Sequence, residues 1–344
     1  MPLPTARRRA DAGIPEPRRE APMPIDRLTD DEIGILLTAA VHAPSMHNTQ
    51  PWRFEVHGPV VDVLLDEERT LQFEDVSGRA THVGLGAAVF NIRVAAAMLG
   101  HETRIATHPD PARPEIKARV YLDRREAPVP DLSSLYGEVS QRHTYRGPLL
   151  DHPIHLTVRR ELDEAACTEG TELHWLEPAS VSGLEVLLRQ TDAEDLYDEE
   201  RRQERETWIG GDRSDEGIAE RALGPQPVRQ SFVRDLSAGF DSPNRSQAVY
   251  ETAPAIVVLS TPDEDEDAWV RAGQAVQRVL LVATSYKLAA SFLDQLLERP
   301  APRSQVRGVI GGRWPQMVLR IGYPAQSNGH TGRRDWRDSF DRWF

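Results

Sequence analysis

The sequence lacks residues on which several classes of protein depend. One cysteine, Cys167, among 344 residues excludes an internal disulfide and a cysteine-based metal site. Because Cys167 follows an apolar helical stretch, we expect a buried structural thiol. Histidines such as His101 and His108 show no metal-ligand spacing, so we expect both to be solvated and predict no metal site. Apolar runs such as Val279–Ala283 fall far short of the ~20 residues that cross a bilayer.

Basic charge is also scarce. Lysine and arginine number 41 against 54 aspartate and glutamate, and the net charge of −13 argues against a general nucleic-acid binder. A Walker loop is absent, and GVIGGRW (308–314) does not fit a dinucleotide-binding fingerprint. Residues 1–24 are rich in proline and arginine but lack the apolar core of a signal peptide. We therefore expect a flexible tail at 1–24, a cytoplasmic protein and no membrane partner.

Helices and strands alternate along the first part of the chain. Leu28–Ala40 predicts a helix with Thr29 as its N-cap. Two strand-like runs, 52–56 and 60–65, flank His57-Gly58-Pro59 and predict a hairpin. Gly84–Leu99 predicts a core helix, because its alanines permit close packing and Gly100 suits the end of a helix. A strand at 119–122 closes this half.

The same order of elements recurs later in the chain. A helix is predicted at Leu156–Ala166 and a strand at Glu172–Leu176, and a late strand at Gln316–Tyr323. GQAVQRVLLVA (273–283) echoes GAAVFNIRVAA (86–96), with four identical residues. Two similar halves in one chain predict a pseudo-dimer with a shared core.

These patterns divide the chain into a first half at 25–132 and a second half at 133–344. Residues 191–250 have no counterpart in the first half and are heavily charged. They form either a solvated helical insertion or a lid over a site. The acidic run at 263–267 lacks apolar spacing and predicts a solvated loop.

One motif with chemical potential is APSMHNTQPW (43–52), between a predicted helix and a predicted strand. Ser45, Asn48 and Gln50 carry donors and acceptors suited to a planar polar heterocycle. Pro44 and Pro51 stiffen the loop and reduce the entropy lost on binding. The same residues also suit an ordinary turn.

Two basic segments could bind a phosphate. In RHTYR (142–146), Arg142, Thr144 and Arg146 fall on one side of an extended chain and could make charge-assisted hydrogen bonds. TGRR (331–334) adds Arg333 and Arg334 near the end of the sequence. Taken singly, both segments also suit solvated surface charge.

Together, these motifs resemble the nitroreductase-like FMN-binding oxidoreductases, and most closely their Acg-like branch of long single-chain members. The resemblance spans roughly residues 28–340. APSMHNTQPW (43–52) matches the family's Ala-Pro-Ser loop, and RHTYR (142–146) matches its Arg-x-Ser-x-Arg segment with Thr144 in the serine place. VLRIGYP (318–324) and GRR (332–334) match the strand and the basic pair at the C-terminal end of the family's sequences. WIGGDRSDEGIAERALG (208–224) is similar to the Trp-containing insertion of the Acg-like branch.

The resemblance implies an α+β nitroreductase-like fold and one FMN held between the halves. By position, it implies phosphate binding by Arg142, Thr144, Arg333 and Arg334, with Arg146 at the O2/N1 edge of the flavin ring. His143 and Tyr145 would point away from the phosphate. The residues implied to face the ring are Pro44, Ser45, Asn48 and Gln50.

The implied function is FMN-dependent oxidoreduction. Hydride would pass from NADH or NADPH to FMN N5 and on to a small acceptor such as a quinone or nitroaromatic. The flavin carries this chemistry, so we assign no catalytic residue. Two alternatives stay open: an FMN-binding or sequestering protein with little reductase activity, and a biosynthetic flavoenzyme acting on one metabolite. A further homodimer of the pseudo-dimer is also open.

Overall fold

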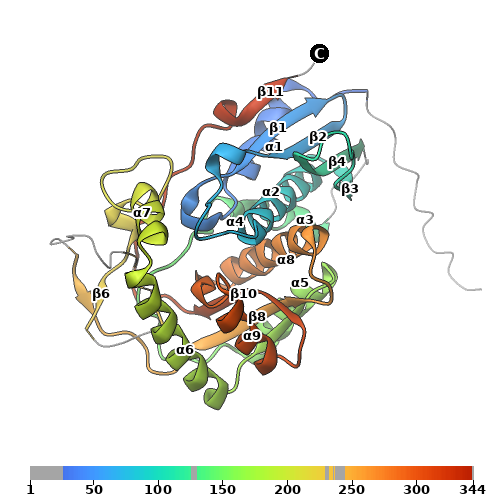
Figure 1. The fold of residues 1–344 in the computed structure, drawn as a ribbon. Coiled ribbons are helices and arrows are strands. Elements are labelled where there is room, and N and C mark those ends of the chain that lie inside the picture. The colour runs from blue at the N-terminus through green and yellow to red at the C-terminus, as the bar shows by residue number, and fades with distance from the viewer. Residues whose placement is uncertain (1–25, 125–129, 229–231, 235, 237–244, 343–344) are drawn as a thin grey trace, which may run out of the picture.

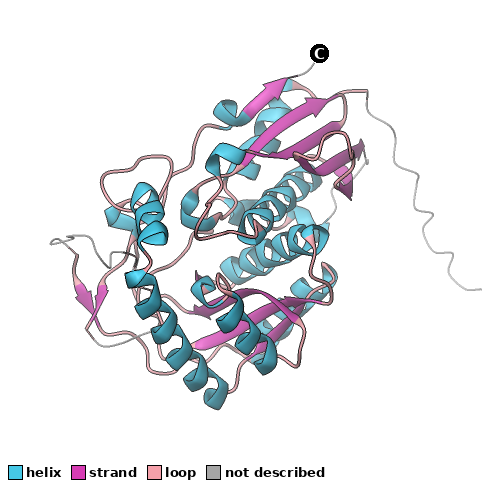
Figure 2. Ribbon diagram, viewed as in Figure 1, coloured by secondary structure: helices cyan, strands magenta, loops and turns pink. Residues whose placement is uncertain are grey.

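The computed structural model describes residues 26–124, 130–228, 232–234, 236 and 245–342. Two sheets lie on opposite sides of a central layer of helices, as Figure 1 shows. Figure 2 shows strands and helices segregated into these layers, which is the predicted α+β class. The segment 1–24, for which we expect a flexible tail, lies outside the described residues.

The first sheet has five strands in the order β11-β1-β2-β4-β3. The predicted hairpin is confirmed, with Trp52 opposite Leu65 and His57 opposite Val60. The last strand in sequence, β11, returns to pair in parallel with β1. The strands are β1 (Trp52–His57), β2 (Val60–Leu65), β3 (His101–Thr107), β4 (Ile116–Arg124) and β11 (Phe340–Arg342).

The second sheet repeats this arrangement. Its order is β5-β8-β10-β9, and every neighbouring pair is antiparallel, as in the β1-β2-β4-β3 part of the first sheet. One helix precedes the first strand of each set and one long helix follows its second strand, so the two halves share one order of elements. The strands are β5 (Glu172–Trp175), β8 (Ala255–Thr261), β9 (Ala289–Phe292) and β10 (Trp314–Gly322).

The long helices α2 (Arg79–Met98) and α8 (Glu266–Ser285) cross at the centre. Gly86 and Gly273, paired in the sequence repeat, face each other at this crossing. A Cβ atom on Gly86 would lie well under 3.0 Å from the Val270 carbonyl oxygen, so only glycine allows the helices this close. By length and composition α2 could cross a membrane, but 89% of its most apolar 18-residue stretch is buried inside the protein, which identifies a core helix.

Three of the helix predictions are confirmed with small shifts at the ends. Helix α1 (Asp30–Val41) begins after the Thr29 cap, and Thr29 and Glu32 form a capping box. Helix α5 (Leu156–Thr168) is present as predicted. Helix α2 begins five residues before the predicted Gly84, because the Asp75 carboxylate accepts from the Ala80 and Thr81 amides and stabilises an earlier first turn.

Other local predictions are wrong. The run at 263–267 is not wholly a loop, because Asp265 caps α8 by accepting from the Ala268 amide, and Glu266 begins the helix. Cys167 is exposed, since it lies on the solvent side of α5. His101 is buried on β3, where its ring meets Glu32.

The insertion contains α6 (Pro178–Tyr197), α7 (Glu199–Trp208) and the short strands β6 (Gln226–Pro227) and β7 (Gln247–Ala248). These elements lie together at one side of the body formed by the two sheets and the central helices (Figures 1 and 2). Helix α6 begins before residue 191, so the segment 191–250 starts inside a helix. Trp208 packs on the buried Ile209 and Ile218.

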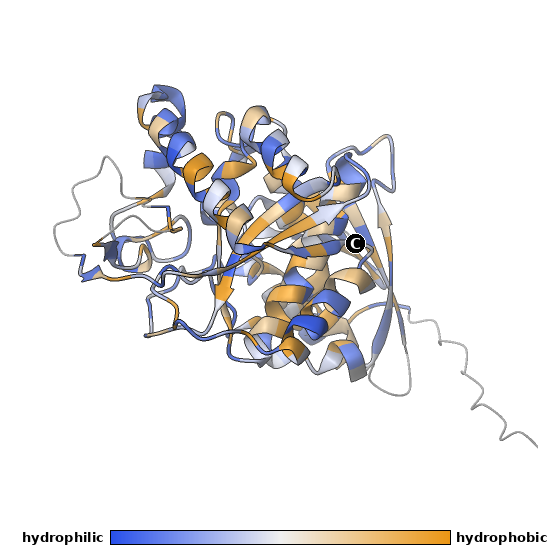
Figure 3. Ribbon diagram, turned by 90° about the horizontal axis from the view of Figure 1, so that it is seen from below, coloured by the Kyte–Doolittle hydropathy of each residue, from blue (hydrophilic) through white to orange (hydrophobic). Residues whose placement is uncertain are grey.

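The remaining helices are short. They are α3 (Pro130–Ser133), α4 (Tyr136–Val139), α9 (Pro300–Val309) and the one-turn 3₁₀ segments η1 (Met46–Asn48), η2 (Glu67–Arg69), η3 (Glu220–Ala222), η4 (Asp294–Leu296) and η5 (Trp336–Ser339). Figure 3 shows orange hydrophobic stretches along the central strands and helices, which form a separate core for each half on either side of the helix crossing.

Candidate functional site

The loop between α1 and β1 has an unusual backbone that its own side chains stabilise. His47, Asn48 and Gln50 have φ values of 48°, 59° and 54°, in the left-handed region. The Ser45 hydroxyl accepts from the Gln50 amide at 2.9 Å and closes the turn. Ser45 also packs against Gly84 of α2, so the loop sits at the start of the central helix.

Asn48 and Gln50 tie this loop to two distant segments. The Asn48 amide donates to the carbonyls of Gly217, at 3.0 Å, and Gly332, at 3.2 Å. The fully buried Gln50 donates to the Asp215 carbonyl at 2.7 Å and accepts from the Arg334 amide at 3.0 Å. These two side chains therefore join the insertion and the C-terminal segment to the loop. Neither lines the cavity described below.

The segment 142–146 runs beside the edge strand of the second sheet. The Tyr145 amide donates to the Ala290 carbonyl of β9 at 2.8 Å. The buried Tyr145 hydroxyl donates to the Pro148 carbonyl, also at 2.8 Å, and His143 is exposed. Thr144 and Arg146 face a cavity instead, as expected from the alternation of an extended chain.

Four arginines gather where this segment meets the C-terminal one. Arg142 and Arg333 line a hollow with His42 and Arg334, and Arg146 lies close enough for its charge to act on Arg333. In the described part of the chain, none of these four guanidinium groups has a carboxylate within ion-pair distance. Their hydrogen bonds go to backbone carbonyls or to the Thr331 hydroxyl.

Burial lowers the pKa of three of these arginines. Desolvation, followed by the charge of Arg333, lowers the pKa of Arg142 to about 9. Desolvation lowers the pKa of Arg146 to about 10, and desolvation with the charge of Arg146 lowers the pKa of Arg333 to about 10. Among the described residues, Nε of Arg142 and Arg333 and one Nη of Arg334 are buried without a hydrogen-bond partner. Such a cluster is set up to bind an anion.

A cavity that is partly open to solvent adjoins this cluster through Thr144 and Arg146. Its largely apolar wall suits a flat aromatic ligand. Each half and the insertion contribute to its wall. The lining residues include Pro44, Ser45, Met46, His47, Val83, Gly84, Thr144, Arg146, Ile218, Val233, Arg234, Leu236, Val276, Phe292, Asp294 and Met317.

The sequence predictions therefore divide into three groups. Pro44 and Ser45 line the cavity with Thr144 and Arg146, and Arg142 lines the arginine hollow with the basic pair of the C-terminal segment. Asn48 and Gln50 hold the surrounding segments together. The structure thus brings the two basic segments together.

A buried charge network beside the cavity was missed by the sequence analysis. Glu74, Asp195 and Glu298 lie together, and arginines from the insertion surround them. Arg205 reaches Glu74 at 2.5 Å, and Arg234 contacts Asp195 and Glu298. These residues are remote in sequence, so no spacing could have revealed them. The network fastens α6 and α7 to the body.

Asp294, at the cavity wall, was also missed. Desolvation, opposed in part by Arg79, raises the pKa of its carboxyl group to about 7. Its Oδ1 accepts from the Val318 amide at 3.2 Å. A carboxyl group that changes charge near neutral pH can affect ligand binding there.

A model of the nitroreductase family matches residues 139–323, more than half of the chain. The chain belongs to the nitroreductase family and is an oxidoreductase, as predicted. It is 28% identical over 303 residues, 87% of this chain and 91% of the other, to "Putative NAD(P)H nitroreductase acg" of Mycobacterium tuberculosis strain CDC 1551 / Oshkosh. It is 29% identical over 300 residues, 85% of each chain, to "Putative NAD(P)H nitroreductase MT3217" of the same strain.

Solved nitroreductases give a weaker likeness. A nitroreductase with bound FMN from Bacteroides fragilis shares 13% identity, with a TM-score of 0.39 over 59% of this chain and 94% of that one. A superposition this distant assigns no residue of this chain.

Proposed function

We propose that this protein is an FMN-dependent oxidoreductase that uses NADH or NADPH and passes electrons to a small acceptor such as a quinone or a nitroaromatic. The observation that carries the proposal is the group of arginines that have no carboxylate partner among the described residues, next to a largely apolar cavity. A ligand with a phosphate beside a flat aromatic ring would match both the arginine group and the apolar cavity. The names of the mycobacterial relatives agree with the reductase class.

The residues present fit FMN. Arg142, Arg333 and Arg334 would hold its phosphate, with Thr144 at the boundary between phosphate and ring. The unpartnered Nε atoms of Arg142 and Arg333 are donors that a phosphate would satisfy. The negative charge of the phosphate would also neutralise part of the positive charge of these arginines, which offsets the cost of burying them.

The cavity would hold the ring. Pro44 and Ser45 would lie against it, and Arg146 would place a positive charge at one edge. When bound, FMN supplies hydride acceptance and donation. The chain's part is to bind the group, to stabilise negative charge near Arg146 and to exclude water with apolar residues such as Val276 and Met317.

A second function, FMN binding with little reductase activity, is supported by the insertion. Ile218 and Leu236 line the cavity, and Gly217 and Asp215 are hydrogen-bonded to the loop at 43–51. A segment fixed in this way would restrict the access of a nicotinamide to the ring. Cytoplasmic location and a further homodimer remain predictions.

Anaerobic reduction separates the two functions. Flavin-loaded protein is mixed with NADH, with NADPH or with dithionite, and the visible flavin absorbance is followed. We expect bleaching by at least one nicotinamide within seconds, and reoxidation on adding a quinone. Bleaching by dithionite alone would establish the binding function and exclude the reductase. If the purified chain retains no flavin after incubation with FMN, both functions are excluded.

A further inference from the structure

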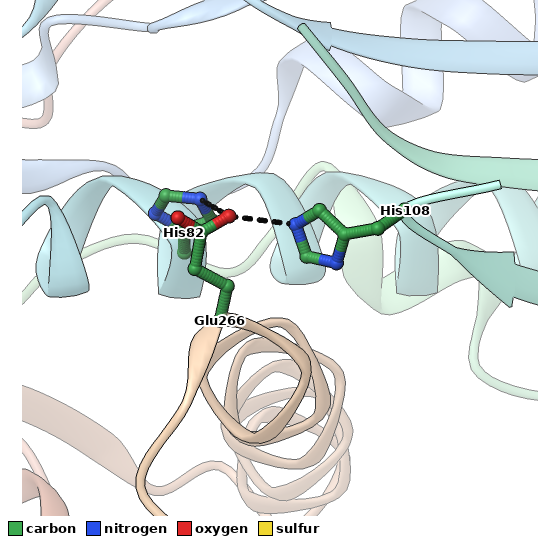
Figure 4. A group of neighbouring side chains, drawn as sticks. All are labelled: His82, His108 and Glu266. Atoms are coloured by element: carbon green, nitrogen blue, oxygen red, sulfur yellow. Dashed lines mark ion pairs between the residues drawn. The ribbon is translucent and has the colours of Figure 1, made fainter. Parts of the chain in front are cut away.

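Two histidines and a glutamate meet at the outer end of the helix crossing, away from the arginine cluster. His82 lies on α2, His108 directly follows β3, and Glu266 is the first residue of α8 (Figure 4). Glu266 Oε2 lies 3.2 Å from His82 Nε2 and 2.8 Å from His108 Nε2. The group therefore joins the first half to the second.

Each imidazole is oriented by a partner behind it. His82 Nδ1 lies 2.7 Å from the Gly78 carbonyl oxygen, and His108 Nδ1 lies 2.7 Å from Asp267 Oδ1. Both partners are acceptors, so each Nδ1 carries the hydrogen and each Nε2 presents a lone pair in the neutral ring. Histidines that bind metals are held in this way, with the far nitrogen donating to a carbonyl or a carboxylate.

At the front of the group, the Nε2 atoms of both imidazoles face one oxygen of the Glu266 carboxylate. Neither Nε2 atom makes a hydrogen bond in the part of the chain that the structure describes, although both lie near the same carboxylate oxygen. His82 is only 5% exposed, so water cannot easily relieve the repulsion between its lone pair and Glu266. A cation between the three atoms would relieve this repulsion.

We propose that His82, His108 and Glu266 bind one divalent ion of the zinc class, which links α2 to α8. Two histidines and one glutamate are a donor set that zinc uses, with metal–ligand distances of about 2.0–2.2 Å. Tetrahedral ligands at that distance lie about 3.3 Å apart, close to the two separations in the group. His108 and Glu266 are partly exposed, which leaves the fourth position to water.

Lys117 is the competitor for this site. Its Nζ lies 3.0 Å from Glu266 Oε2 and supplies part of the missing positive charge. It contacts only the carboxylate, so it leaves both imidazole lone pairs unsatisfied. A metal ion would meet all three donors at once.

Two other groups of possible ligands have their charge already balanced. Glu55 and Asp62, beside His57, each receive a two-bond contact from an arginine. The Glu74 group is surrounded by the arginines described above. His57 thus provides a matched control, since it too is a histidine between two carboxylates.

Zinc titration of the full chain, stripped with a chelator, tests the site by calorimetry. We expect one equivalent to bind and the melting temperature to rise, because the ion joins two halves. His108→Ala should weaken binding at least ~100-fold, since loss of a mere supporting partner already costs about 10–100-fold. His57→Ala should bind as the parent chain does. Absence of zinc binding, or equal binding by His108→Ala and the parent chain, would overturn the proposal.

Two further variants test the arrangement around the ligands. Asp267→Asn should weaken zinc by about 10–100-fold with the stoichiometry unchanged, because the orienting carboxylate is lost. Lys117→Met should strengthen binding, because its ammonium no longer competes for Glu266. If Lys117→Met weakens zinc binding, the metal does not occupy the space between these three donors. None of these measurements depends on flavin or on reductase activity.

Discussion

Arginine side chains occupy two electrically different settings in this protein. Arg320 is buried, and its guanidinium meets Glu251, with 2.7 Å between Nη2 and Oε2. Arg142 is also buried, but among the described residues the one hydrogen bond of its guanidinium goes to the His42 carbonyl. A buried charge without a counter-charge lowers stability, so Arg142 is better explained by a missing anion than by packing.

Arg142→Gln should therefore weaken flavin binding without lowering the stability of the flavin-free chain. The loss of one charged hydrogen bond is worth about 1.5–3 kcal/mol, or roughly 10–150-fold in affinity. Fluorescence titration with FMN measures the affinity, and thermal unfolding of the flavin-free chain measures stability. Arg160→Gln, at an exposed arginine, is the control. Unchanged affinity in Arg142→Gln would remove this residue from the site.

Asp294 predicts a pH dependence of stability. Its folded pKa, about 7, exceeds the ordinary value of 3.8. The folded state thus holds a proton that the unfolded state has lost, and stability falls as pH rises from about 4 to about 7. Asp294→Asn removes this effect. The free energy of unfolding of the variant relative to that of the parent chain should therefore increase from pH 5 to pH 8.

Urea unfolding of the flavin-free chain at several pH values measures that advantage. Glu194→Gln, at an exposed carboxylate, should show no such trend. A constant difference between Asp294→Asn and the parent chain would mean that Asp294 ionises normally.

At this scale, sequence reasoning works where contacts are local or belong to a motif. The motifs singled out Ser45, Thr144 and Arg146, and the structure brings these three residues to the wall of one cavity. Their role in flavin binding stays a prediction. They could not reveal that Asn48 and Gln50 hold other segments, because their partners lie more than 160 residues away. Asp294 carried no signal either, since only the fold brings it to the cavity.

At the scale of elements, amphipathic and small-residue patterns predicted the helices α1, α2 and α5 and the strands β1, β2, β4, β5 and β10, but not β8, β9 or β11. The strand β3 was not predicted, because it is an edge strand whose residues, HETRIAT, do not alternate in polarity. The start of α8 was misplaced, because its first turn is acidic and polar, as suits a helix N-terminus. The small residues of α2 correctly indicated close packing.

Gly86→Ala tests that packing. In an open helix this change adds up to about 1 kcal/mol of stability. Here the new Cβ would lie well under 3.0 Å from the Val270 carbonyl oxygen, so α2 and α8 must separate, and we expect the melting temperature to fall by several degrees. A Cβ at Gly183 on α6 would have no atom within 4 Å, so Gly183→Ala should leave the melting temperature unchanged or raise it. Equal effects of the two changes would contradict the close crossing.

At the scale of the whole molecule, two halves with one order of elements could form two equivalent sites, yet the residues support one. The site described above takes its loop from the first half and its basic segment from 142–146. At the equivalent place after α5 the link to β5 is short and contains Glu169. Glu169 accepts from Arg93 at 2.6 Å and from Arg278 at 2.8 Å, so the arginines there are already balanced.

We therefore predict one FMN per chain. A second phosphate would have to displace Glu169, whose charge repels it, and the residues before α1 contain no Arg-x-Thr-x-Arg spacing to replace the lost contacts. Flavin released by denaturation, measured against protein by amino-acid analysis, should be close to one equivalent. Glu169→Gln removes one carboxylate partner from Arg93 and from Arg278, which keeps its contact with Asp131, but it adds no loop, so it should leave this value unchanged. A value near two in the parent chain would show that the Glu169 region binds flavin despite its ion pairs, and the asymmetry argued from them would be wrong.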